Sequence, residues 1–289
     1  MSLPNTLWSI VLNLPVPGFN PTPYRHHGQT WAIYRKKQGS YAQQLTEQLT
    51  DTIGPEYPIS AHLDDCRIVP STHPALMTAA IYNQPTRQTL TFLHIDADHA
   101  RLLTPAHPLR LDNGPASTRT RPQKNWQPFL TDDRRLTIVY DAQPFTIATP
   151  TDQPNTWHIA HRMPWTLPPW AAQTERTPRM STAPLYLPDG RLLWLWHIKD
   201  KQSGYWTGAN LSDPEFPYTP THTTAQPLLR PEDAADVSPH WPPNRCIFPM
   251  TALLQPPNII ELWAGDSDRS AIVLYAPLPK ILERMENLT

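Results

Sequence analysis

The chain has 289 residues, and its 24 lysines and arginines nearly balance its 25 aspartates and glutamates, which leaves a formal net charge of −1. Such a chain lacks the broad positive surface that binding to nucleic acid or to anionic membranes requires. It holds 37 prolines, without a collagen-like period, and only 9 glycines. Because proline interrupts helices and central strands, we expect short elements and rigid loops, and 11 tryptophans with 39% hydrophobic residues predict a packed core.

Cys66 and Cys246 are the two cysteines of the chain, and their spacing indicates neither a disulfide framework nor a zinc site. The first apolar run, residues 7–14, is short and follows no basic segment, so it does not resemble a secretory signal. No stretch is long enough to span a bilayer as a helix. We therefore expect a soluble, reduced, cytoplasmic protein that needs no metal ion or cofactor.

Short extended runs bounded by Pro, Asp, Asn or Gly make up most of the chain. Five hairpins share one internal order, which is a polar cluster, a strand, a turn and a second, aromatic-rich strand. Their strand pairs are 19–24 with 30–35, 64–69 with 77–82, 124–130 with 136–140, 180–187 with 192–197, and 247–254 with 259–263. Two segments favour helices instead: 40–52, with a thin apolar face, and the tail 279–288, which begins with a proline.

The hairpins recur roughly 45 to 65 residues apart, and further extended segments follow them. Each repeat then holds about four strands, the content of a β-propeller blade. A proline-rich β-sandwich is the alternative, but it gives no reason for a polar cluster at the same point of each hairpin. In a propeller that point is the end of the innermost strand, facing the central funnel. We predict one all-β domain over residues 1–289, a five-bladed β-propeller with a short C-terminal helix and with blades that begin near residues 19, 63, 124, 180 and 246.

The second polar cluster, Asp64-Asp65-Cys66-Arg67, carries the candidate chemistry. Two adjacent carboxylates and an arginine at the mouth of a strand can grip a polyol and donate a proton. Proton donation needs a carboxyl group kept protonated by an enclosed site or by a neighbouring charge, which Asp64 would supply if both side chains point into the funnel. Adjacent residues of a regular strand face opposite ways, so convergence stays open, and the alternative is a turn cap paired with Arg67.

Five motifs, taken together, resemble the β-mannoside phosphorylases and their relatives, glycoside hydrolase family 130. Asp64-Asp65-Cys66-Arg67 resembles the family's Glu-Asp-Pro-Arg motif, with Cys in place of Pro and Asp in place of Glu. The third-blade segment, residues 124–129, is similar to an uncharacterised branch that reads Lys-Asn-Trp-x-Pro-Phe. The other matches are Asn20-Pro21 with Tyr34-Arg35, Leu195-Trp196-His197, and Phe248-Pro249-Met250-Thr251-Ala252 with Trp263-Ala264-Gly265-Asp266-Ser267-Asp268.

The resemblance implies roles for individual residues. Asp65 would be the catalytic acid, Asp268 would hold the sugar, and Arg35 and His197 would lie near a phosphate. The further candidates are Asn20, Asp64, Arg67, Asn125 and Trp126 for the substrate, and Lys124 and Arg179 for a phosphate or donor group. For any single tryptophan, packing between blades is the simpler interpretation. Where the family has a Gly-rich segment this chain has residues 180–182, Met-Ser-Thr, so no complete set of phosphate ligands emerges.

The sequence therefore predicts a carbohydrate-active enzyme, a phosphorylase or glycosyltransferase that makes or breaks a β-mannoside-like bond with Asp65 as general acid/base. Its partners would be a sugar or oligosaccharide, with phosphate, a sugar phosphate or a nucleotide sugar as donor. Ordinary hydrolysis would use a second carboxylate, and none has a comparable context. Two alternatives stay open, a non-catalytic carbohydrate-binding propeller and a propeller that serves as a protein-interaction platform.

Overall fold

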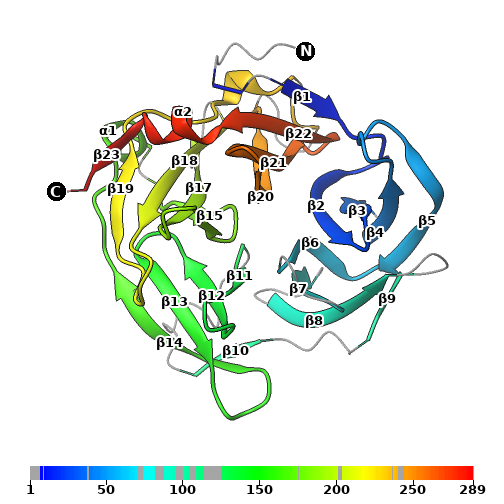
Figure 1. The fold of residues 1–289 in the computed structure, drawn as a ribbon, viewed down its shortest axis with the longest axis horizontal. Helices are drawn as coiled ribbons and strands as arrows, with labels where there is room; N and C mark the ends of the chain where they lie inside the picture. Colours follow the sequence, from blue (N-terminus) through cyan, green and yellow to red (C-terminus); the bar gives the residue numbers. More distant parts are fainter. Residues whose placement is uncertain are drawn as a thin grey trace.

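The structure, a computed structural model, describes residues 7–8, 10–37, 39–69, 74–81, 88–95, 100–103, 109–112, 125–174, 176–200, 204–235, 237–239 and 244–288. Within these ranges, five sheets stand around a common axis (Figure 1). We number them as blades I to V in chain order. The predicted all-β fold, a five-bladed β-propeller, is confirmed.

Each blade places its first strand next to the axis and its later strands further out (Figure 1). Blade I consists of β2 (Phe19–His26), β3 (Gln29–Lys36), β4 (Gly39–Leu45) and β5 (Thr52–Ser60). Blade II consists of β6 (Leu63–Ile68), β7 (Ala75–Ile81), β8 (Gln88–Ile95) and β9 (Ala100–Leu102). Blade III consists of β11 (Gln127–Leu130), β12 (Leu136–Asp141), β13 (Phe145–Pro150) and β14 (Thr156–Met163), with β10 (Arg110–Leu111) parallel to β14.

Blade IV has a divided inner edge, because β15 (Arg179–Met180) and β16 (Leu185–Tyr186) both pair with β17 (Leu192–Asp200). Its outer strands are β18 (Gly204–Ser212) and β19 (Pro220–Thr224). Blade V consists of β20 (Ile247–Gln255), β21 (Ile259–Asp266) and β22 (Ser270–Pro277).

The two ends of the chain each add a strand to a late blade. β1 (Ile10–Asn13) pairs antiparallel with β22 of blade V. β23 (Met285–Asn287) pairs antiparallel with β19 of blade IV. Figure 1 shows β1 beside β22 where the chain turns into blade I. The hydrogen bonds between β1 and β22 therefore join the segment that leads into blade I to blade V, and so close the ring.

Helices are short in the described part of the chain. α1 (Pro169–Ala172) and a 3₁₀ turn (Pro231–Asp233) lie in the connections before and after blade IV, and no described helix is long and apolar enough to cross a membrane. The expected C-terminal helix is present as α2 (Leu278–Leu282), but it stops before β23. The helix expected over residues 40–52 is wrong, because most of this segment forms β4 and the turn after it. β3 and β5 pair with β4 on both sides, and this pairing overrides a weak helical pattern.

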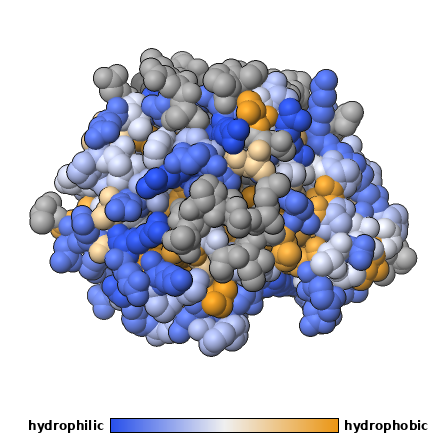
Figure 2. Space-filling view, turned by 90° about the horizontal axis from the view of Figure 1, so that it is seen from above, coloured by the Kyte–Doolittle hydropathy of each residue, from blue (hydrophilic) through white to orange (hydrophobic). Residues whose placement is uncertain are grey.

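The hydrophobic cores lie between neighbouring blades, as β17 illustrates. Leu193 and Leu195 pack toward blade V, whereas Trp194 and Trp196 pack toward blade III. Because strand side chains alternate, a strand with a blade on each face reads as a continuous apolar run. The face of the molecule that Figure 2 shows is mostly hydrophilic where its residues are described, with scattered apolar residues.

Candidate functional site

The inner strands of blades I, II and III begin with a shared backbone feature, at what we call the upper end of the ring. Asn20, Asp65 and Asn125 have φ angles of 53°, 46° and 72°, in the left-handed region that most side chains avoid. Asparagine and aspartate tolerate this region because their short polar side chains bond locally. In blade II the β6–β7 ladder also shifts register between Asp64 and Arg67, as at a β-bulge, which re-aims side chains.

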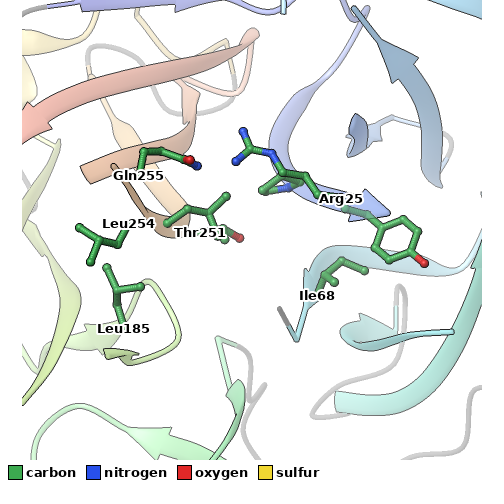
Figure 3. Close-up of a pocket in the computed structure, with 9 residues that line it drawn as sticks. Arg25, Ile68, Leu185, Thr251, Leu254 and Gln255 are labelled. Atoms are coloured by element: carbon green, nitrogen blue, oxygen red, sulfur yellow. The ribbon is translucent and has the colours of Figure 1, made fainter. Parts of the chain in front are cut away.

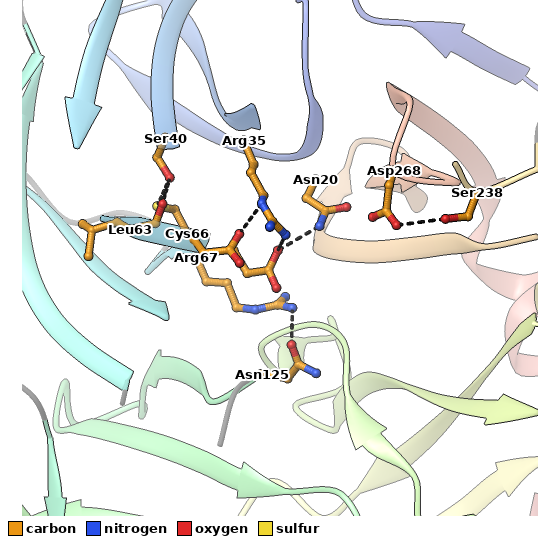
Figure 4. A network of polar contacts seen from close by, with 11 residues as sticks. Asn20, Arg35, Ser40, Leu63, Cys66, Arg67, Asn125, Ser238 and Asp268 are labelled. Carbon is orange, nitrogen blue, oxygen red and sulfur yellow. Dashed lines mark hydrogen bonds and ion pairs between the residues drawn. The ribbon is translucent and has the colours of Figure 1, made fainter. Parts of the chain in front are cut away.

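The bulge turns both acidic side chains of the motif toward one arginine. Arg35 Nε lies 2.7 Å from Asp64 Oδ1, and Arg35 Nη1 lies 3.9 Å from Asp65 Oδ1 (Figure 4). In a regular strand the two carboxylates would face opposite sides of the sheet. The convergence that the sequence left open therefore occurs, and the arginine comes from the end of β3 in blade I.

Asp65 is enclosed, with 4% of its surface exposed. Asn20 Nδ2 donates a hydrogen bond of 2.8 Å to Asp65 Oδ1. The other side of the Asn20 amide faces Gly265, whose missing side chain leaves the space that Asn20 Oδ1 occupies. Blades I, II and V thus each contribute to the position of one carboxylate.

Cys66, which stands where the family motif has proline, points away from the axis. It packs in the core between blades I and II, and its Sγ donates to Ser40 Oγ at 3.2 Å. Burial raises the pKa of the Cys66 thiol to about 12, so it is protonated at neutral pH. Because the thiolate is the reactive form, Cys66 has a packing role and not a nucleophilic one.

Arg67 extends from blade II across the axis and contacts the other side of the ring. Its Nη1 donates to the main-chain carbonyls of Ser181 at 2.5 Å and Met250 at 3.0 Å, and its Nη2 donates to Asn125 Oδ1 at 3.4 Å. Burial lowers the pKa of the guanidinium to about 10, with the charge of Asp65 opposing the shift, so it stays charged at neutral pH. One side chain thus joins blade II to blades III, IV and V.

His197 lies beside this crossing arginine, at the upper end of β17. Its Nδ1 is 2.8 Å from Ser181 Oγ, and its ring packs edge-on against Phe248, over which the Arg67 guanidinium also lies at 5.8 Å. The structure therefore brings His197 together with Arg67, on the side of the axis opposite blade I.

Tyr205, at the start of β18, belongs to the same group and was missed by the sequence analysis. Its ring lies 5.4 Å from that of His197 and 6.0 Å from that of Phe248. Burial raises the pKa of the Tyr205 phenol, and the charges of Cys246, Asp268 and Asp65 add to the effect. The phenol is therefore protonated and can donate a hydrogen bond, and the charges of two acidic candidates, Asp268 and Asp65, act on it. An isolated Gly-Tyr pair carries no sequence signal for this position.

Asp268 lies in the turn after β21, with a left-handed φ of 56°. Ser238 Oγ donates to its Oδ2 at 3.3 Å (Figure 4). Asp266 is buried nearby and accepts from the Ala235 main-chain N–H at 3.0 Å, so it fixes a loop. Of these two aspartates, Asp268 is the one whose charge contributes to the raised pKa of Tyr205.

Three of the predicted site residues are not seen among the side chains at the upper end of the axis. Trp126 is 4% exposed and packs edge-on against Tyr140, in the core beside blade III. Arg179 pairs with Asp141 across the junction of blades III and IV, at 3.1 Å. Lys124 lies outside the described residues. Within the described ranges, no three His, Cys, Asp or Glu side chains are grouped to hold a metal ion.

The upper end of the axis therefore offers an enclosed carboxylate with an amide and an arginine beside it, and a protonated phenol near a histidine. No protein-family model matches the chain, and no curated protein does. Solved structures do match. A glycosyl hydrolase from Bacteroides ovatus is 14% identical with a TM-score of 0.65, and the match covers 95% of this chain and 90% of that chain.

Two further matching structures are of proteins whose names state a reaction. A β-1,2-mannobiose phosphorylase from Listeria innocua, in complex with β-1,2-mannobiose, is 12% identical with a TM-score of 0.62 over 98% of this chain and 94% of that one. A GDP-Man-dependent mannosyltransferase from Leishmania mexicana is 12% identical with a TM-score of 0.61 over 94% and 91%. The likeness shows a shared fold. At these identities it shows no more than that.

Proposed function

We propose that the chain is a carbohydrate-active enzyme that makes or breaks a β-mannoside-like glycosidic bond, with Asp65 as the general acid/base. The observation that carries the proposal is the enclosure of Asp65 at the upper end of the axis, held by Asn20 and faced by Arg35. A general acid must be fixed in position and shielded from water to transfer a proton efficiently. The bulge at Asp65 supplies that position.

The three solved structures support the carbohydrate class. Their names describe a hydrolase, a phosphorylase and a mannosyltransferase, and two of them name mannose or a mannoside. All three reaction types cleave or form a bond at a sugar, and such reactions use an acid at the departing oxygen or a base at the attacking one. We propose Asp64, Asn20, Asn125 and Asp268 as contacts to sugar hydroxyls, and Arg35 and His197 as contacts to the donor.

The test is a screen of mannose 1-phosphate and GDP-mannose against an acceptor panel of mono- and oligosaccharides, with release of phosphate or GDP as the readout. With a productive pair in hand, Asp65→Asn should keep sugar binding and lose turnover by roughly 10²–10⁴-fold, the usual size of general acid/base catalysis. Asp133→Asn is the matched control, since Asp133 lies exposed in the β11–β12 turn and pairs with Arg135. Full turnover by Asp65→Asn would exclude the proposed role.

A non-catalytic sugar-binding propeller is the second candidate, and one observation favours it. Asn20 donates to Asp65 and Arg35 lies close to it, and both are partners that suit a charged carboxylate and not a proton donor. This candidate predicts saturable binding of mannosides by the wild-type protein without release of phosphate, nucleotide or free sugar from any tested donor. Any turnover that Asp65→Asn abolishes would reject it.

A further inference from the structure

A layer of buried polar side chains fills the axis below the candidate site. In blades I, II and III, the residue two positions after the left-handed Asn or Asp points inward; these residues are Thr22, Arg67 and Gln127, and Thr251 of blade V joins them. Thr22 Oγ1 and Thr251 Oγ1 are 2.5 Å apart, and Gln127 Nε2 donates to the Ser181 carbonyl at 3.1 Å. We call these four residues the plug. They lie between the candidate site and the lower ends of the inner strands.

A cavity of about 380 Å³ lies below the plug. The lower ends of the inner strands of blades I, II, IV and V line it, and Thr251 is shared with the plug; the lining residues are Pro23, Tyr24, Arg25, Ile68, Leu185, Thr251, Leu253, Leu254 and Gln255. Pockets that bind small molecules commonly hold roughly 300–1,000 Å³. The cavity is thus large enough for a small ligand.

The lining divides into an apolar wall and two polar groups. Ile68, Leu185 and Leu254 present aliphatic side chains, whereas the Arg25 guanidinium and the Gln255 amide point toward each other across the cavity (Figure 3). Such a lining, mostly apolar with a few converging polar groups, is typical of ligand sites. A ligand that fits must therefore have an aliphatic body and a polar head.

The charge of Arg25 is already compensated. Its Nη2 donates to Glu261 Oε1 at 2.6 Å, and Trp263 Nε1 donates to the same oxygen at 2.6 Å. The Glu261 side chain is 4% exposed, so its charge stays behind the arginine, whose side chain is 37% exposed. The arginine would attract an anionic head, but the buried carboxylate behind it would repel that head. A cationic head would be repelled by the arginine directly. The pair favours an uncharged head that accepts hydrogen bonds.

We propose that the lower cavity is a second ligand site, which binds a small uncharged amphipathic molecule. A carbonyl or hydroxyl oxygen of the ligand accepts from Arg25 and Gln255, and its aliphatic body contacts Ile68, Leu185 and Leu254. The proposal does not depend on the reaction at Asp65, because neither Asp65 nor its partners Asn20 and Arg35 line the cavity.

Calorimetric titration of the full chain with hexanamide, hexanoate and hexylammonium tests the proposal, because the three probes share one aliphatic length and differ in charge. Hexanamide should bind saturably at one site. Hexanoate and hexylammonium should each bind about ten-fold more weakly, since a charged head must lose water beside an ion pair that has no net charge. Equal or tighter binding of either charged probe would overturn the uncharged class, and absence of hexanamide binding would overturn the site.

Two variants locate the binding. Leu254→Trp fills the cavity and should weaken hexanamide binding by about ten-fold or more. Ile53→Trp adds the same indole to an exposed position on β5 and should leave the affinity for hexanamide unchanged. Gln255→Leu removes one polar partner of the ligand and should weaken hexanamide binding by about five-fold. This variant provides a test even if Leu254→Trp does not fold. Unchanged affinity in a folded Leu254→Trp, or in Gln255→Leu, would overturn the placement.

Discussion

At the scale of single residues, Gly265 sets the position of Asn20 and through it that of Asp65. A Cβ atom on residue 265 would lie 2.1 Å from Asn20 Oδ1 and 3.0 Å from the Asn20 main-chain nitrogen. Gly265→Ala should therefore displace Asn20, remove its hydrogen bond to Asp65 and cost about 1–3 kcal/mol of unfolding free energy. Urea unfolding and sugar binding measure the two effects.

Gly190→Ala is the control for this change. Gly190 has a positive φ of 86° in the turn between β16 and β17. A Cβ atom added there would have Pro214, at 3.7 Å, as its nearest neighbour. The variant should lose stability through backbone strain while its sugar binding stays at the wild-type level. Wild-type sugar binding in Gly265→Ala would contradict the positioning role of Asn20.

A second residue-scale prediction concerns Asp141, which lies buried beside Arg179. Burial raises the pKa of this carboxyl from 3.8 to about 6, although Arg179 opposes the shift. Since the folded state holds the proton more tightly than the unfolded state, Asp141 stabilises the fold fully below pH 4, and this contribution is lost as the pH rises to 6. Two pKa units correspond to about 3 kcal/mol.

Urea unfolding of wild type and Asp141→Asn between pH 4 and pH 7 measures this contribution. The wild type should lose stability relative to the variant across this range, because other titrating groups cancel in the difference. Parallel pH curves would show that the pKa of Asp141 is not raised in the fold. Arg179 is thus a partner of Asp141 here, and its proposed contact with a donor group stays a prediction.

At the scale of elements, the inner strands are held together by polar contacts across the axis. Arg67→Met removes the charged donor to the Ser181 and Met250 carbonyls and should lower the unfolding free energy by about 3 kcal/mol, since the buried Met250 carbonyl loses this bond and the Ser181 carbonyl keeps only the one from Gln127. Arg135→Met is the matched control, because Arg135 pairs with Asp133 on the surface and should cost less than about 1 kcal/mol. Equal losses in urea unfolding would contradict the structural role of Arg67.

The same elements show which features of the fold and the site can be predicted from the sequence. Alternating runs and turn residues predicted the five hairpins and the shared polar cluster, because these signals are local. The sequence did not predict that Asp64 and Asp65 would converge, since a bulge depends on register with β7. Nor did it predict β4, whose strand conformation comes from partners on both sides.

At the scale of the whole molecule, the upper and lower ends of the axis differ in what the sequence reveals. The upper end collects the polar clusters, so its residues stand out even without the fold. The lower cavity is lined by residues such as Leu185 and Leu254, which read as ordinary strand positions until the ring brings them together. A site that consists of strand ends from four blades therefore requires the structure.

Closure of the ring gives the last prediction. Leu14 continues β1, donates its main-chain N–H to Ala271 at 2.9 Å and packs between blades V and I, where the ring closes. Leu288 follows β23 and donates to Thr221 at 2.8 Å, on the outer edge of blade IV. Leu14→Pro and Leu288→Pro thus each remove one leucine side chain and one main-chain hydrogen bond.

The two variants should differ because their places in the ring differ. Leu14→Pro should cost about 3 kcal/mol and speed amide exchange in β22 and β2 together, since the junction between the first and last blades loosens. Leu288→Pro should cost about 1 kcal/mol and leave exchange in β2 and β22 at the wild-type rate, because Leu288 packs against the core between blades III and IV and not at the junction of blades V and I. Urea unfolding with hydrogen exchange resolved by mass spectrometry measures both. If exchange in β2 stays at the wild-type rate in Leu14→Pro, the junction between blades V and I does not depend on the segment that continues β1.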